Sequence, residues 1–279
     1  MVSEENTMAT ECCYCGNPTM LPSRFSGMLK PDFVIPFKKT KEEAVAALEE
    51  FYKDKMLLPD KFTANNRVQA IQGMYVPFWL FNSDISASGV YKGENDSVVT
   101  TPDEIITTTS VYRCERNGSM RFERIPVDGS KKMDDSYMES IEPFDYSELV
   151  PFSSAYLSGF LADKYDVDAE AAVARADERV CRSAEGCLEN TVTGFMRTHQ
   201  MEDCAVFKEN GVVQYAMVPV WILTTQYEGK PYTFMMNGQT GRLVGSLPAD
   251  KNKLLLYTTG TFLAAFVVLY LLLSNTIMK

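Results

Sequence analysis

The chain has 279 residues, of which 46% are apolar, enough for a packed core in one large domain or two small ones. Its formal net charge is −10, and residues 1–250 alone carry 24 basic against 37 acidic side chains, or −13. Phosphates repel such an acidic body, so the composition argues against nucleic-acid binding.

The N-terminus reads MVSEENTMATEC, without a basic start and an apolar stretch, so we expect no secretory signal. Seven cysteines are an odd number, and we expect them to be reduced, as in the cytosol. Cys181 and Cys187 fall on one predicted helix, turned about 120° away from each other. We interpret Cys114, Cys181, Cys187 and Cys204 as small buried apolar residues.

A C-x-x-C pair is the first motif, in the sequence CCYCGNPT. Cys12 and Cys15, followed by a glycine, have the spacing of a zinc knuckle and are the candidate metal ligands. A structural zinc needs four ligands, and only this pair is present, with Cys13 spare. Three interpretations stay open: zinc completed by dimerisation or an unexpected ligand, a redox pair, or an unmetallated vestige. Residues 1–31 form this partial zinc-ribbon knuckle.

Residues 32–37, DFVIPF, predict a short strand. Thr40, with Glu43 three residues on, is a capping box that opens a helix over about 40–56. Pro59 is expected to end that helix. Its predicted buried stripe consists of Ala44, Leu48, Phe51 and Tyr52.

Two stretches of the chain resemble each other: residues 72–81 read QGMYVPFWLF and residues 214–223 read QYAMVPVWIL, at a fixed offset of 142. Their shared Trp79 and Trp221 are the only tryptophans, and we expect core positions rather than ligand platforms. An amphipathic helix precedes each copy. We interpret this as an internal duplication of a helix-plus-strands module, with coincidence between two core strands as the alternative.

The first module is predicted to span residues 32–150 and the second residues 151–250. After Tyr91 the first copy is expected to run into a polar, Thr-rich connection. Asn117-Gly118 then predicts a two-residue turn between strands at 105–115 and 119–125.

A helix over about 168–188 opens the rest of the second module, and a four-stranded antiparallel meander follows it. The predicted buried stripe of the helix is Val173, Ala176, Val180, Ala184 and Leu188. The predicted strands are 204–208, 212–226, 230–236 and 242–246. Their turns are Asn210-Gly211, Glu228-Gly229 and the NGQTG sequence at 237–241, each with a glycine able to take positive φ.

The last apolar run, residues 254–273, is uncharged and predicts a single transmembrane helix, since twenty residues span roughly 30 Å as a helix. A buried core helix is the alternative. Lys251 and Lys253 on its flank indicate that the body faces the cytoplasm, which makes the protein tail-anchored in the cell membrane. Gly260 and Ala264 stand four residues apart, a spacing that permits a homodimer through helix pairing.

The sequence has no P-loop, G-x-G-x-x-G, nucleophile elbow or H-E-x-x-H motif, and a single histidine, His199. We therefore predict no catalytic residues and no enzyme. Asp128-Gly129-Ser130 is interpreted as an Asx-turn. The acidic residues interpreted as solvated surface are Asp134, Asp135, Glu142, Asp145 and Glu148.

Several stretches together resemble a family of uncharacterised bacterial membrane proteins labelled as TFIIB-type zinc-ribbon proteins. They are ATECCYCGNPTMLPSRFSG, PDFVIPFKKTKEEA, GMYVPFWLF, the run from Phe122 to Asp168, and VPVWILTTQYEGKPYTFMMNGQTGRLVGSLP, which cover most of residues 8–249. Relatives in Firmicutes genomes can lie near flotillin-like (SPFH) and phage-shock-A-like genes. Members carry two C-x-x-C knuckles. Cys12 and Cys15 match the last, and the first is missing here.

We therefore expect an α+β fold of duplicated helix-plus-antiparallel-strand modules with a C-terminal transmembrane helix. The expected function is a membrane-tethered, cytosol-facing, non-catalytic adaptor or scaffold. The resemblance implies a role in membrane stress or membrane-domain organisation, with a flotillin-like or phage-shock-A-like partner besides the lipid bilayer. The alternative is a ligand-binding or enzymatic module that uses a cleft between the two repeats. Zinc at the half site is the one cofactor considered.

Overall fold

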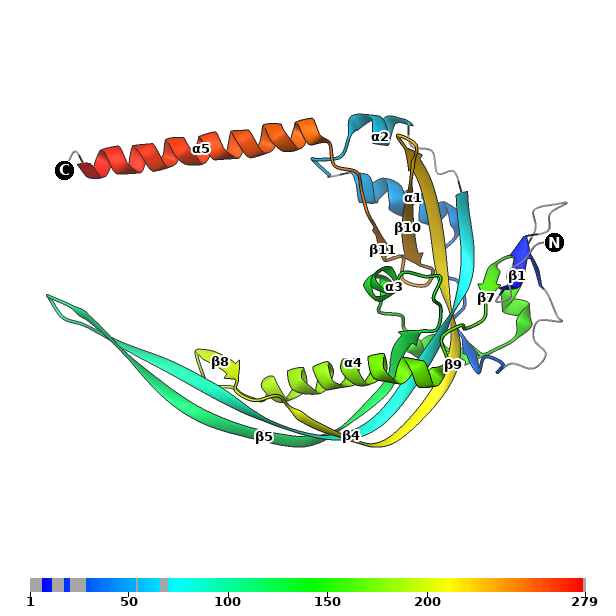
Figure 1. Cartoon of the computed structure of the whole chain (residues 1–279), viewed down its shortest axis with the longest axis horizontal. Helices are drawn as coiled ribbons and strands as arrows, with labels where there is room; N and C mark the ends of the chain where they lie inside the picture. The colour runs from blue at the N-terminus through cyan, green and yellow to red at the C-terminus, as the bar shows by residue number, and fades with distance from the viewer. Residues whose placement is uncertain (1–6, 12–17, 21–28, 54, 66–69, 278–279) are drawn as a thin grey trace. The chain divides into compact units, whose positions relative to one another are not determined.

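A computed structural model describes residues 7–11, 18–20, 29–53, 55–65 and 70–277, and the fold is α+β, as predicted (Figure 1). The strands are β1 Thr7–Glu11, β2 Pro18–Met20, β3 Phe33–Val34, β4 Ala70–Thr100, β5 Ile105–Asp128, β6 Val150–Pro151, β7 Leu161–Asp163, β8 Arg197–Gln200, β9 Ala205–Tyr227, β10 Lys230–Asn237 and β11 Leu243–Gly245. The helices are α1 Lys41–Tyr52, α2 Asp60–Asn65, α3 Asp135–Ile141, α4 Ala169–Glu189 and α5 Lys251–Ile277, with short 3-10 turns at Tyr146–Glu148 and Ser154–Leu157.

The chain divides into two compact units, each built from three separate segments. Unit 1 consists of Met1–Pro36, Tyr75–Asp134 and Tyr146–Val218. Unit 2 consists of Phe37–Met74, Asp135–Asp145 and Pro219–Lys279. These units interleave along the chain, whereas the sequence predicts consecutive modules, because β4 and β9 each contribute residues to both units.

A long hairpin of β4 and β5 dominates unit 1, with its pairing running from Phe78↔Asp128 to Thr100↔Ile105. Its turn lies at residues 101–104, where the Thr101 N–H donates to the Glu104 carbonyl over 2.8 Å. The predicted Asn117-Gly118 turn is wrong, since these residues pair with Ser88 and Ala87 in mid-strand. An Asn-Gly pair only permits a turn, and here the ladder with β4 continues through it, from Ser83↔Phe122 to Thr100↔Ile105.

Helix α4 covers one face of this hairpin (Figure 1). The buried side chains between them are Ile85, Ala87, Tyr91 and Cys114 of the hairpin, with Val180, Ala184, Leu188 and Val192. Ala176 is also buried, so four of the five predicted stripe residues of α4 are confirmed. Val173 is half-buried and Ala172 lies in the core instead, because the buried face follows a strict four-residue spacing.

In unit 1 strand β9 lies beside β4 and also pairs in parallel with β3, where Phe33 aligns with Ala216. The predicted Asn210-Gly211 turn is wrong, because β9 continues through it. A side chain at Gly211 would meet the Asn82 carbonyl at 3.7 Å, so this glycine faces the neighbouring strand rather than a turn.

Unit 2 contains a meander of β9, β10 and β11, with three strands rather than the predicted four. The Glu228-Gly229 turn is confirmed: both residues have positive φ, 50° and 77°, as a tight hairpin turn requires. The turn at 237–241 is also confirmed, with Gly241 at φ 83°.

The capping box of α1 is confirmed. The Glu43 N–H donates to Thr40 Oγ1 over 3.2 Å, and the Thr40 N–H donates to Glu43 Oε2 over 2.8 Å. The helix ends at Tyr52, earlier than predicted, and Pro59 instead precedes α2. This agrees with the preference of proline for helix starts.

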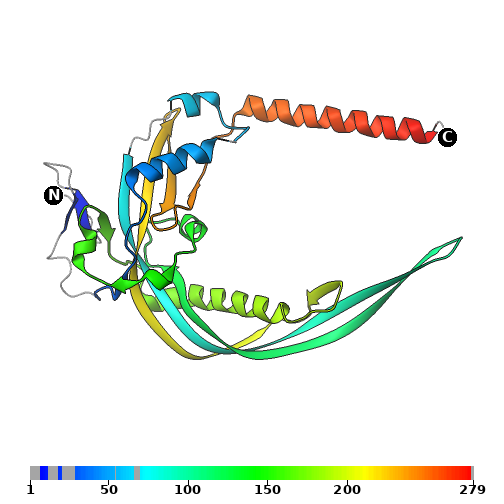
Figure 2. The same cartoon turned by 180° about the vertical axis from the view of Figure 1, so that it is seen from behind.

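The C-terminal α5 is one continuous helix (Figure 2). Residues Lys251–Tyr270 are long and apolar enough to cross a membrane, and none of the window is buried against the protein. These properties are compatible with a membrane anchor. The alternative of a buried core helix is wrong for this described stretch.

Candidate functional site

Trp79 fixes a corner of unit 1 where β4, the end of β5 and the start of α4 meet. Its Nε1 donates to the Val167 carbonyl over 2.8 Å, just before the N-cap of α4. The Gly129 N–H donates to the Pro77 carbonyl over 2.8 Å. The Gly129 carbonyl in turn accepts from the N–H groups of Asp166 and Val167, over 2.9 and 3.1 Å. The strand, the loop and the helix entrance are thereby joined by one network.

Trp221 fixes a corner of unit 2 with the same set of bonds. Its Nε1 donates to the Lys39 carbonyl over 2.8 Å, just before the N-cap of α1. The Gly238 N–H donates to the Pro219 carbonyl over 2.8 Å. The Gly238 carbonyl accepts from the N–H groups of Lys38 and Lys39, over 3.0 and 2.8 Å. Both tryptophans are buried, which confirms their predicted core role.

The two corners combine helices and strands differently from the two predicted copies. In the sequence α1 precedes β4 and α4 precedes β9. In the structure Trp79 of β4 binds the entrance of α4, whereas Trp221 of β9 binds the entrance of α1. Each corner therefore joins the helix of one predicted copy to the strands of the other.

We expect Gly238→Ala to lower the free energy of unfolding by about 1–3 kcal/mol, because an added Cβ would overpack the second corner. It would lie 2.7 Å from the Phe37 ring and 2.9 Å from Pro219 Cβ. Gly186→Ala is the control: no atom lies within 4 Å of its Cβ, and removing a helical glycine should stabilise by roughly 0.5–1 kcal/mol. Urea denaturation of both variants measures the difference. Equal stability of the two would contradict the packing argument.

Asp128 is a buried ion-pair residue, so the interpretation of residues 128–130 as a simple Asx-turn is incomplete. The side chain of Asp128 is 2% exposed, and its Oδ1 accepts from Arg175 Nη1 over 3.0 Å. Arg179 of the same helix donates to the Pro126 carbonyl over 2.9 Å. Two arginines of α4 therefore hold the end of β5.

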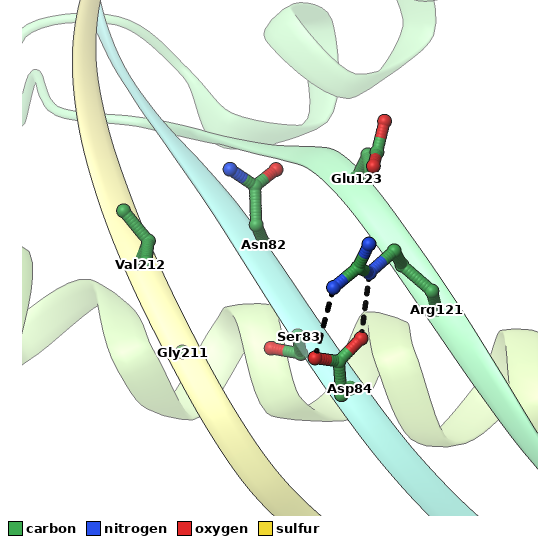
Figure 3. A pocket seen from close by; sticks show the side chains of 7 residues that line it. All are labelled: Asn82, Ser83, Asp84, Arg121, Glu123, Gly211 and Val212. Atoms are coloured by element: carbon green, nitrogen blue, oxygen red, sulfur yellow. Dashed lines mark hydrogen bonds and ion pairs between the residues drawn. The ribbon is translucent and has the colours of Figure 1, made fainter.

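A shallow pocket of about 280 Å³ opens where β4, β5 and β9 lie side by side (Figure 3). It is lined by Asn82, Ser83, Asp84, Arg121, Glu123, Gly211 and Val212. The pairing of β4 with β5 shifts register between Phe81 and Ser83, and Arg124 has φ 58°. This bulge places the Asn82 Oδ1 to accept from the Arg124 N–H over 2.7 Å.

Asp84 and Arg121 form the charged centre of this pocket (Figure 3). Two hydrogen bonds of 2.7 and 3.2 Å join them, and the bond from Arg121 lowers the pKa of Asp84. Asp84 therefore stays ionised at neutral pH and suits charge pairing better than general-acid chemistry. The Ser83 hydroxyl is buried, with no hydrogen-bond partner among the described residues. This arrangement suits a small polar ligand.

The tip of the β4–β5 hairpin exposes apolar side chains to solvent. We call residues 97–108 the distal hairpin. Strand β8 pairs with β4 only as far as Glu94, opposite Arg197. Arg197 also bridges to Asp96 over 2.7 Å. Four large apolar side chains of the distal hairpin are between 45% and 71% exposed: Val98, Val99, Ile105 and Ile106.

The sequence predicts a polar connection up to residue 104 and a strand from residue 105. The strand is confirmed, but the polar connection is wrong, because β4 continues to Thr100. The runs VVTT and IITTT are rich in β-branched residues, which favour strands, and they flank the short turn sequence PDE. This signal was sufficient to predict a hairpin. The acidic residues and the many threonines of the region instead favoured the interpretation as a polar connection.

The candidate metal ligands Cys12 and Cys15 lie outside the described residues, so the zinc site stays a prediction. Elsewhere, the part of the chain that the structure describes brings together no group of three His, Cys, Asp or Glu side chains suited to a metal ion. Of the cysteines interpreted as buried, only Cys114 is so; Cys181 and Cys204 are half-buried and Cys187 is exposed. Burial raises the pKa of the Cys181 thiol.

The acidic residues predicted to be solvated surface divide into two groups. Asp134, Asp135 and Asp145 are exposed, whereas Glu142 and Glu148 are half-buried. The Glu142 carbonyl accepts from Arg242 over 2.7 Å. The prediction of solvated surface is therefore confirmed for the three aspartates, whereas the two glutamates are only partly exposed.

One curated relative aligns with nearly the whole chain. The uncharacterised protein YdjG of Bacillus subtilis (strain 168) is 34% identical over 259 residues, which cover 89% of this chain and 74% of the relative. The chain belongs to the family of YdjG. No protein-family model matches the chain, and no solved structure matches it.

Proposed function

We propose that the protein is a membrane-tethered, non-catalytic adaptor that holds a partner protein on its distal hairpin. The support for a tether is the apolar α5, and the support for partner binding is the group of four exposed apolar side chains on residues 97–108. The exposed distal hairpin is the main observation that supports the proposal. Soluble surfaces rarely keep neighbouring Val and Ile side chains in water without a use for them.

The distal hairpin also has strand edges to offer. Beyond Asp96 it is a two-stranded ribbon within the described residues, and such a ribbon is only marginally stable alone in water. An added strand from a partner would satisfy the free backbone groups, and contacts with the exposed apolar side chains would supply specificity. We therefore favour β-strand addition as the mode of binding.

The zinc-ribbon resemblance suggests the class of partner. Flotillin-like and phage-shock-A-like proteins are the candidates, with a role in membrane stress or membrane-domain organisation. The flanking Lys251 and Lys253 favour a body on the cytoplasmic side of the cell membrane. Zinc at Cys12 and Cys15 belongs to the same proposal, with a degenerate knuckle as its alternative.

Internal duplication of the body is a further part of this proposal. The matched bonds of Trp79 and Trp221, and of Gly129 and Gly238, support descent of the two corners from one module. The exchanged helices would then have arisen as in a domain swap within one chain. Pairing of two copies through Gly260 and Ala264 is also proposed, since both are exposed on α5.

Affinity purification of the full chain in mild detergent tests the adaptor proposal. We expect a partner to be recovered with the native chain and lost with Ile105→Lys, which charges the distal hairpin. Phe207→Lys is the matched control, because Phe207 of β9 is exposed to a similar extent. Recovery of no partner under any growth condition, together with turnover of a small molecule, would overturn the proposal. Equal recovery by both variants would exclude the hairpin as the binding surface.

A further inference from the structure

The start of α5 is bound to the loop that joins α1 and α2, within unit 2. The Asp250 N–H donates to the Leu57 carbonyl over 2.8 Å. Lys253 Nζ donates to the Leu58 carbonyl over 2.9 Å and to Asp60 Oδ1 over 2.5 Å. Asp250 also caps the helix by accepting from the Asn252 N–H over 2.8 Å. The loop and the first turn of α5 therefore form one joint (Figures 1 and 2).

This joint determines the depth at which the α1–α2 loop would lie relative to a bilayer. The uncharged run begins at Leu254, directly after Lys253, so the headgroup region lies at the first turn of α5. Residues 57 and 58 bind that same turn. If α5 crosses the membrane, the α1–α2 loop must lie at the headgroup level.

The loop presents the chemistry that an interface requires. Met56 is 65% exposed, and Lys55, Lys61 and Lys251 are also exposed. Among the described residues none of these three lysines forms an ion pair, and Lys55 lies over the Phe51 ring at 5.2 Å. A groove of about 340 Å³ runs between residues 55–58 and residues 247–249, and most of its wall is apolar.

Charge also favours an anionic leaflet at this place. Residues 50–61 and 250–253 hold five lysines and four acidic residues, a net +1, in a chain of net −10. The segments joined to the start of α5 are therefore not acidic, unlike the rest of the chain. Each lysine near an anionic surface strengthens binding, and an apolar side chain beside it can enter the acyl boundary.

We propose that the α1–α2 loop and the first turn of α2 form a second membrane contact, in which Lys55 and Lys61 bind the phosphates of anionic phospholipids and Met56 enters the interface. The proposal rests on membrane insertion of α5. Lys251 and Lys253 flank the apolar run, but the side chain of Lys253 is engaged by Asp60 and Leu58. The loop replaces it as the basic contact.

Tryptophan quenching in vesicles tests this contact. The full chain with Met56→Trp is reconstituted into phosphatidylcholine, alone or mixed with phosphatidylglycerol, with bromine high on the acyl chains. Trp79 and Trp221 are buried and give the baseline in the native chain. We expect added quenching from position 56, stronger with phosphatidylglycerol. Lys55→Glu and Lys61→Glu should each shift the docked-to-free ratio roughly five-fold towards free.

Lys41→Glu is the matched control, because it makes the same charge change at the opposite end of α1, roughly 18 Å away along the helix, and should leave quenching unchanged. In the native chain, acetylation of Lys55 mapped by mass spectrometry should be slower in anionic vesicles than in detergent. Flotation after carbonate extraction reports insertion of α5 separately. If α5 is inserted but position 56 is not quenched, this inference is wrong and the membrane tether stands. The same holds if a second copy covers position 56. A chain that does not float overturns the membrane tether.

Discussion

Trp221→Ala is expected to lower the free energy of unfolding by about 3–5 kcal/mol, the usual cost of truncating a buried tryptophan. The side chain is 7% exposed, and its ring meets Phe37 edge-on at a centroid distance of 5.2 Å. The substitution also removes the hydrogen bond to the Lys39 carbonyl, which holds the entrance of α1 against β9. Urea denaturation in detergent, followed by the emission of the remaining Trp79, measures the loss.

Trp221→Phe separates the two contributions. Phenylalanine keeps most of the packing against Phe37 but cannot donate to the Lys39 carbonyl, so we expect a loss of roughly 1 kcal/mol. Trp79→Ala should cost as much as Trp221→Ala, because Trp79 makes the same bond to the entrance of α4 and packs on Tyr165 and Tyr215. If Trp221→Ala costs no more than Trp221→Phe, the ring does not stabilise the corner.

The sequence was informative about the corners because their signals are local. The capping box of Thr40 and the core positions of Trp79 and Trp221 are read from short stretches, and both predictions are confirmed. The exchange of helices between the corners was not predictable in the same way. It depends on contacts such as Trp221 with Lys39, 182 residues apart, and no periodicity in the sequence records them.

The failed turns have a different physical reason. Asn117-Gly118 and Asn210-Gly211 have the residues of tight turns, yet both lie within continuous strands. Turn propensity is worth little against an uninterrupted ladder, since register is decided by pairing along the whole strand. Glu228-Gly229 succeeded because the flanking strands β9 and β10 pair directly on both sides of it. For the candidate site the apolar strands of the distal hairpin were readable, but the pocket at the bulge required the register of β4 and β5.

Arg175→Ala is the other substitution with a large expected effect. It removes one partner of buried Asp128, in contact over 3.0 Å, and breaking a buried ion pair typically costs about 3–5 kcal/mol. We expect a value at the low end, since the Arg175 side chain is 31% exposed. Arg182→Ala is the control in the same helix. Its pair with Glu178 is 2.7 Å long but exposed, so its loss should cost no more than about 0.5 kcal/mol.

The double variant Arg175→Met with Asp128→Leu tests whether the buried charge of Asp128 causes the loss. Replacing a buried ion pair with apolar residues of similar volume is often neutral, so we expect most of the stability of the native chain to return. Failure to recover would mean that the geometry of the pair, rather than the buried charge, stabilises α4.

Because α4 covers the β4–β5 hairpin, Arg175→Ala should also speed amide hydrogen exchange in the covered part of the hairpin, around Tyr91 and Cys114. The distal hairpin, which α4 does not cover, should exchange at an unchanged rate, and this difference would link the ion pair to the support of the proposed binding surface.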